Sequence, residues 1–126
     1  MTYAEYFENF KSKFMGTDVS NINEHLAYQF NIVDEDCGGI FYVEVKDGEL
    51  HIEPYEYFDR DAIFISDAKT LMRIAEGKED PVFSYTVQTL RVEGDLEKAL
   101  KLKDIIELKK KEEKAAKKKT TAKAEK

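Results

Sequence analysis

A pair of alternating apolar segments joined by an Asp-Gly turn constrains the fold of this chain most strongly. Asp47-Gly48 favours a tight type I′ turn, because both central positions of that turn require a positive φ. On either side of it, apolar residues alternate along 40–52 and share one predicted face: Phe41, Val43, Val45, Leu50 and Ile52. An isolated hairpin is marginal in water, so the sequence predicts a larger sheet.

Helices and further strands surround this hairpin. Strands are predicted over 25–33, 62–65 and 87–93, the last with Gln88, Leu90 and Val92 on one side. Aromatic residues at spacings of three and four predict an amphipathic helix that ends at a glycine: Tyr3, Tyr6, Phe7, Phe10, Phe14 and Gly16. Other helices are predicted over 67–77, briefly over 81–85, and from 96 onward with Leu96, Ala99, Leu100, Lys103 and Ile106 on its main face.

Composition limits the class of protein. With 126 residues, 42% of them hydrophobic, the chain fits one compact domain. Its longest apolar runs, such as residues 63–65, are far shorter than the roughly 20 residues needed to span a bilayer, and residues 1–20 do not resemble a signal peptide. We therefore expect a cytoplasmic protein. The single Cys37 excludes an internal disulfide and a multi-thiolate zinc site, so no structural metal is expected.

The charge is divided between a body and a tail. Residues 109–126 contain nine Lys and three Glu, a net charge of +6, so the remaining chain carries −12. We predict a domain over 1–108 and a Lys-rich extension over 109–126, disordered or a frayed helix. Such a tail can bind nucleic acid or an anionic membrane surface, serve simply as a solvated end, or lie against the acidic body. The acidic body makes specific nucleic-acid binding unexpected.

Catalytic signatures are weak. Only His25 and His51 can act as imidazole bases, and no nucleophile motif accompanies either. The acids around Cys37 disfavour a thiolate. We therefore predict a protein that is not an enzyme, with neither a catalytic residue nor a cofactor.

Several segments follow one another in a characteristic order: the Lys-Asp-Gly turn, the strand ending in Pro54, residues 61–66, residues 71–81 and residues 90–102. In this order, over about residues 25–107, the chain resembles the sterol carrier protein 2 family. The family usually has Gly-Lys where Gln88-Thr89 stands here. The resemblance implies an α/β (α+β) fold with a five-stranded mixed sheet, helices on one face and a hydrophobic tunnel between them.

The resemblance also implies a function. Family members bind or transfer sterols, fatty acids or acyl-CoA, without a metal or redox cofactor. Carried over position by position, it assigns these ligand-binding residues: Phe64, Leu71, Ile74, Phe83, Tyr85, Leu90, Val92, Leu96, Leu100 and Ile105. We thus expect intracellular, non-catalytic lipid binding or transport. The alternative is an interaction module with a filled core, whose basic tail contacts an anionic partner; the sequence does not distinguish oligomeric states.

Overall fold

The computed structural model describes residues 1–56 and 58–112. Its nine elements are, in chain order, α1 Tyr3–Phe14, β1 Leu26–Ile32, β2 Gly39–Lys46, β3 Glu49–Glu53, β4 Ala62–Ser66, α2 Ala68–Ala75, α3 Pro81–Thr86, β5 Leu90–Gly94 and α4 Leu96–Leu100. The helical backbone is interrupted at Lys101 and continues over residues 102–112. Among the described residues, no helix is both long and apolar enough to cross a membrane.

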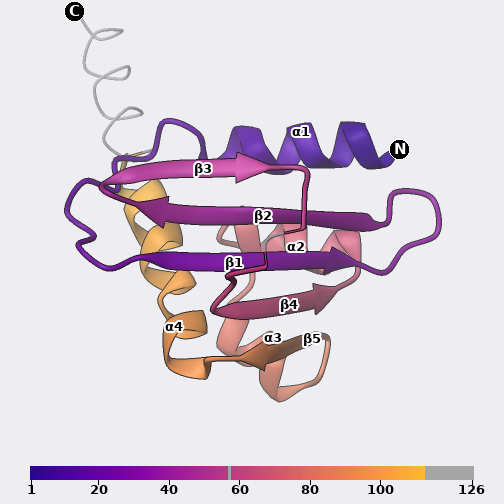
Figure 1. Cartoon of the computed structure of the whole chain (residues 1–126). Helices are drawn as coiled ribbons and strands as arrows, with labels where there is room; N and C mark the ends of the chain where they lie inside the picture. Colours follow the sequence, from indigo (N-terminus) through magenta and orange to yellow (C-terminus); the bar gives the residue numbers. More distant parts are fainter. Residues whose placement is uncertain (57, 113–126) are drawn as a thin grey trace, which may run out of the picture.

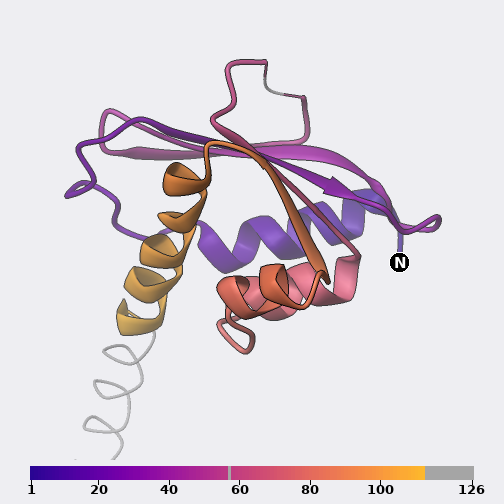
Figure 2. The same cartoon turned by 90° about the horizontal axis from the view of Figure 1, so that it is seen from below.

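The strands form a single five-stranded sheet in the order β3-β2-β1-β4-β5 (Figure 1). β1 and β4 are parallel, and the other neighbouring pairs are antiparallel, so the sheet is mixed. All four helices lie on one face, whereas the loop between β3 and β4 lies on the other (Figure 2). The predicted fold class is therefore confirmed.

Local signals explain where the elements begin and end. Thr2 and Glu5 form a capping box at the start of α1, and Asp67 caps α2 by accepting a hydrogen bond from the Thr70 amide. The predicted hairpin is present: Asp47 and Gly48 have φ of 53° and 75°, as a type I′ turn requires.

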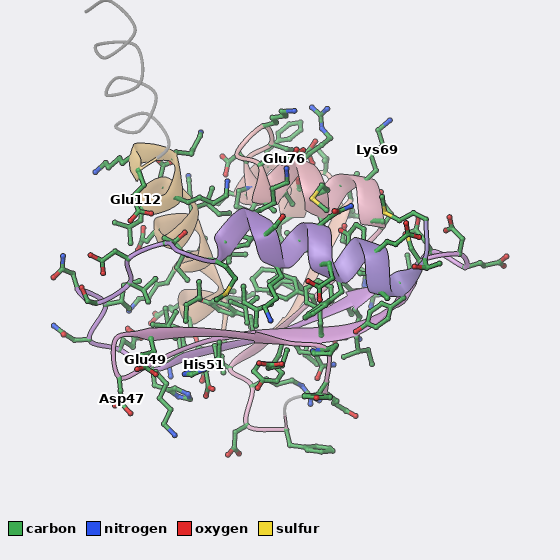
Figure 3. All side chains as sticks on the ribbon, turned by 90° about the horizontal axis from the view of Figure 1, so that it is seen from above. Asp47, Glu49, His51, Lys69, Glu76 and Glu112 are labelled. Carbon is green, nitrogen blue, oxygen red and sulfur yellow. The ribbon has the colours of Figure 1, made fainter. Side chains whose placement is uncertain are left out.

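Aromatic side chains fill the space between α1 and the sheet. Phe10 has its ring centroid 4.7 Å from that of Phe41 and 5.3 Å from that of Phe30. Phe30 in turn stacks against both Phe41 and Phe64. These rings are almost entirely buried. The part of the core beneath α1 is therefore packed with side chains (Figure 3).

The start of β5 differs from the prediction over 87–93. The strand begins only at Leu90, because α3 extends to Thr86 and Gln88 then adopts a left-handed φ of 68°. The Thr89 amide donates to the Ser84 carbonyl at 3.0 Å and closes this turn. Gln88 thus lies outside the strand and does not share a face with Leu90 and Val92.

The C-terminal helical segment packs into the body. Leu102, Ile105 and Ile106 are buried, as is Lys109. The Glu112 carboxylate accepts a hydrogen bond from the Asp18 amide at 2.9 Å. The predicted domain boundary after residue 108 therefore falls within a helix, and the remainder of the predicted tail, residues 113–126, lies outside the described residues.

Candidate functional site

An apolar pocket of about 330 Å³ opens between α3, β5 and α4. α3 and α4 lie on the helix-bearing face of the sheet (Figure 2), and β5 is an edge strand, so the pocket that they line lies on this face at the β5 edge. Apolar side chains make up most of its lining: Phe64, Pro81, Val82, Tyr85, Thr86, Leu90, Val92, Leu96, Ala99, Leu100 and Lys103. Its volume is at the lower end of the roughly 300–1,000 Å³ that small-molecule sites occupy.

The α3 wall exposes its apolar side chains. Asp80 caps this helix and Pro81 occupies its first turn, which favours a helix start at this point. Ser84 is the one buried residue of the helix, and its hydroxyl donates to Glu79 at 2.5 Å. Val82 and Tyr85, by contrast, are partly exposed and line the pocket. A helix that buries serine and exposes valine and tyrosine presents an unpartnered apolar surface.

The α4 wall shows the same pattern. Leu96 and Leu100, four residues apart on one helical face, are 48% and 56% exposed although both line the pocket. Ala99, on the same helix, is buried. Two exposed leucines on an apolar concavity are the surface that a hydrophobic ligand would cover.

Polar contacts anchor α4 to the sheet. The Tyr28 hydroxyl donates to the Lys98 carbonyl at 2.5 Å, and the Lys98 ammonium lies 3.1 Å from Oδ1 of Asp61. The other carboxylate oxygen of Asp61 accepts the Ala27 amide at 2.8 Å. Lys101 also pairs with Glu24. Burial raises the pKa of Tyr28, so this phenol stays neutral.

Phe64, Leu90 and Val92 form the inner surface of the pocket. Val92 of β5 pairs with Phe64 of β4, so the two side chains are neighbours across the ladder. Leu90 and Phe64 are almost completely buried. The pocket therefore rests directly on the hydrophobic core.

Lys103 is the charged residue in this described lining. Its ammonium lies 3.6 Å from Oδ1 of Asp80, and both side chains are about half exposed. A positive charge thus stands at the rim of an otherwise apolar surface.

The structure brings together only part of the predicted ligand-binding set. Those that line the pocket are Phe64, Tyr85, Leu90, Val92, Leu96 and Leu100. Leu71, Ile74 and Ile105 are instead buried in the core, each at most 2% exposed. Phe83 is 58% exposed and does not line the pocket. The space is a pocket at one edge of the sheet, and the implied tunnel stays a prediction.

Five lining residues were not among the predicted site residues: Pro81, Val82, Thr86, Ala99 and Lys103. Helical spacing carries a signal for most of them. Val82 precedes Tyr85 by three residues and Thr86 by four, so these three share a face of α3, and Lys103 follows Ala99 by four on the helix predicted from residue 96 onward. The sequence does not show that no other element packs on these helix faces, so it could not identify these residues as part of a pocket.

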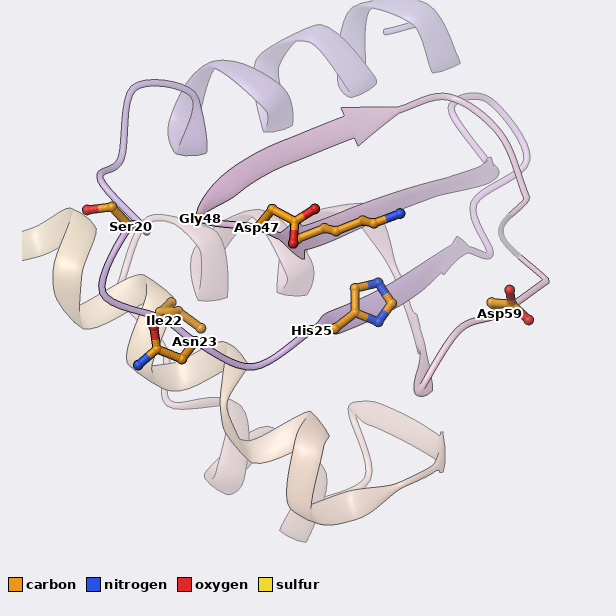
Figure 4. A pocket seen from close by; sticks show the side chains of 8 residues that line it. Ser20, Ile22, Asn23, His25, Asp47, Gly48 and Asp59 are labelled. Carbon is orange, nitrogen blue, oxygen red and sulfur yellow. The ribbon is translucent and has the colours of Figure 1, made fainter.

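A larger hollow of about 750 Å³ lies near the β2–β3 turn and is mainly polar (Figure 4). Its lining is Ser20, Ile22, Asn23, His25, Lys46, Asp47, Gly48 and Asp59. His25 Nε2 lies 2.6 Å from a carboxylate oxygen of Glu44. Hydrophobic ligands have little surface to bury in this hollow, so the smaller apolar pocket is the better candidate.

Cys37 lies beside Asp34 and Asp36, with one ligand atom from each residue within 4.8 Å of the others. Burial, followed by the charges of Asp36 and Asp34, raises the pKa of the Cys37 thiol. Oδ1 of Asp34 accepts the Ala68 amide at 2.7 Å and so helps to start α2. The thiol therefore remains protonated near neutral pH, unlike an activated nucleophile.

Comparison with known families decides how this arrangement is classified. The model of the SCP-2 sterol transfer family matches residues 7–107. This chain belongs to the SCP-2 sterol transfer family. A comparison with curated protein sequences found no match.

Solved SCP-2 structures share the fold. Palmitated SCP2L2 from Aedes aegypti has 17% identity and a TM-score of 0.62, covering 84% of this chain and 95% of that one. Apo sterol carrier protein 2 from Yarrowia lipolytica has 15% identity and a TM-score of 0.53, covering 82% and 75%. At such identities these structures show the fold alone.

The SCP-2 fold also occurs as part of an enzyme. The sec-alkylsulfatase Pisa1 from Pseudomonas sp. has 16% identity and a TM-score of 0.55, covering 81% of this chain but only 14% of the sulfatase. SCP-2 family membership supports lipid binding and transfer in general, and the family is generally one of non-catalytic lipid carriers.

Proposed function

We propose that this SCP-2 family chain is a non-catalytic carrier that binds a hydrophobic small molecule in the pocket between α3, β5 and α4. The ligand classes are fatty acid, sterol and acyl-CoA. The observation that carries the proposal is the exposure of Leu96 and Leu100 on the wall of an apolar concavity. Covering such surface supplies up to about 0.8 kcal/mol per buried methylene, so affinity does not require many polar contacts.

Two comparisons support a hydrophobic ligand. The matching family is described as one of sterol transfer. The SCP2L2 neighbour from Aedes aegypti is a palmitated protein. We extend both to this chain as a proposal, together with the cytoplasmic location expected of a lipid carrier.

The first test is denaturing extraction of the purified full chain followed by mass spectrometry, paired with displacement of a fluorescent fatty acid. We expect a copurifying lipid or saturable displacement. Absence of both, with protein that is folded by circular dichroism, would contradict the carrier proposal and favour the interaction module.

A pair of variants then tests whether the ligand binds in this pocket. Leu100→Asp adds a charge to the pocket wall, and the fold should tolerate it because Leu100 is 56% exposed. Phe58→Asp is the matched control, because Phe58 is 83% exposed and does not line the pocket. It belongs to the β3–β4 loop, which lies on the face of the sheet opposite the helices (Figure 2). We expect Leu100→Asp to abolish probe uptake and Phe58→Asp to retain it. Undiminished uptake by folded Leu100→Asp would exclude this pocket.

We also propose that the Lys-rich segment contacts anionic membranes. The deletion should begin at residue 113, because Lys109 is buried and the Glu112 carboxylate accepts a hydrogen bond from the Asp18 amide, so both residues belong to the folded body. We expect the shortened chain to lose cosedimentation with vesicles containing phosphatidylserine and to keep its lipid binding. Unchanged cosedimentation would refute this role.

A further inference from the structure

Lys103 is a charged residue in the lining of an otherwise apolar pocket. It follows the break in the helix at Lys101 and lines the pocket together with Leu96, Ala99 and Leu100. Its side chain is 47% exposed, which leaves the ammonium at the rim. Lysine commonly lays its methylene stem along apolar surface while its charged end stays in water.

The ammonium of Lys103 has spare capacity for another anion. Nζ lies 3.6 Å from Oδ1 of Asp80, and exposed ion pairs of this kind are weak. The ammonium carries three N–H donors. The same Asp80 oxygen accepts the Val82 amide at 3.0 Å, so Asp80 has a second role that holds it at the start of α3 when Lys103 turns away.

We infer, resting on the proposed binding function, that the pocket prefers single-chain amphiphiles with a carboxylate head group over neutral lipids, and that Lys103 pairs with that carboxylate. The chain of the ligand would lie against Leu96 and Leu100. A neutral alcohol of the same chain length buries the same apolar surface and lacks only the ion pair. The small pocket volume of about 330 Å³ also favours a flexible chain over a rigid fused-ring sterol.

Asp80 has the opposite effect on such a ligand. Its carboxylate repels an incoming anion and competes for Lys103. Replacing Asp80 by Asn removes this charge and preserves the cap, because Asn caps helices as well as Asp does. Lys103 and Asp80 variants therefore change carboxylate selectivity in opposite directions.

The test is isothermal titration calorimetry of the full chain with laurate and with lauryl alcohol, below the concentration at which either aggregates. We expect the wild type to bind laurate roughly three- to tenfold more tightly than the alcohol. Lys103→Met should abolish that ratio by weakening laurate binding, and Asp80→Asn should increase the ratio. Lys69→Met is the control, because Lys69 lies on α2 and does not line this pocket (Figure 3).

The outcomes distinguish the role of Lys103 in selectivity from the proposed carrier function. Equal binding of laurate and alcohol by the wild type, or a laurate preference that survives in folded Lys103→Met, overturns the role of Lys103 while the carrier function stands. A preference that fails to rise in Asp80→Asn also contradicts the electrostatic assignment. If the folded wild-type protein binds neither laurate nor lauryl alcohol, the proposed carrier function is contradicted.

Discussion

Asp61 connects the pocket wall to the centre of the sheet and is the most informative residue to change. Its Oδ2 accepts the Ala27 amide at 2.8 Å, and its Oδ1 lies 3.1 Å from the Lys98 ammonium on α4. Its own amide donates to Ala27, and its carbonyl accepts the Asp95 amide that begins α4. Replacing Asp61 by alanine removes the two side-chain contacts and leaves the backbone contacts possible.

The expected cost follows from the Ala27 contact. Ala27 is completely buried, so its amide finds no water when the carboxylate is removed. A hydrogen bond to a charged group contributes about 1.5–3 kcal/mol, so we expect Asp61→Ala to lower the free energy of unfolding by roughly 2 kcal/mol. Asp61→Asn keeps an acceptor for the amide and loses only the ion pair, and it should therefore cost clearly less.

Urea unfolding of both variants measures these costs. We expect lower midpoints and an unchanged slope, since the surface exposed on unfolding stays the same. Asp61→Ala should also weaken ligand binding, because it removes the ion pair to Lys98, which lies on the helix that carries Leu96 and Leu100. A loss below about 0.5 kcal/mol for Asp61→Ala, or equal losses for the two variants, would refute the reasoning.

Three further predictions follow from buried groups. Phe41→Ala should destabilise the fold by about 3–5 kcal/mol in urea unfolding, because its ring packs against Phe10 and Phe30, and a cost near 1 kcal/mol would contradict that packing. Burial raises the pKa values of Tyr6 and Tyr28, so the unfolded chain releases these protons first; stability should fall as pH rises above about 10, and less steeply in Tyr28→Phe. The raised pKa and burial of Cys37 predict alkylation by iodoacetamide at pH 7.5 that is much slower in folded than in urea-unfolded protein, and equal rates would contradict the buried thiol.

Local signals account for most of the fold. The Asp47-Gly48 turn, the aromatic spacing of α1 and the Asp67 cap each predicted an element that the structure contains. The prediction of β5 wrongly included Gln88. Alternation of apolar and polar residues does not indicate that a residue will adopt a positive φ after a short helix.

The candidate site was less predictable. Leu71 and Leu100 both occupy apolar positions on helices, yet one is buried and the other is half exposed on the pocket wall. Periodicity identifies a helix's apolar face but not whether another element covers it. Lys103 appeared on the predicted face of the last helix, and only the three-dimensional arrangement shows that it stands at the rim of a pocket and 3.6 Å from Asp80.

The most direct test of the proposed carrier function is a laurate titration followed by ¹⁵N and methyl NMR. We expect the largest shifts, and contacts between ligand and protein protons, at Val82, Leu96 and Leu100. Shifts centred on Phe7 of α1 and on Phe41 of β2, or the absence of saturable shifts from folded protein, would contradict a ligand site between α3, β5 and α4.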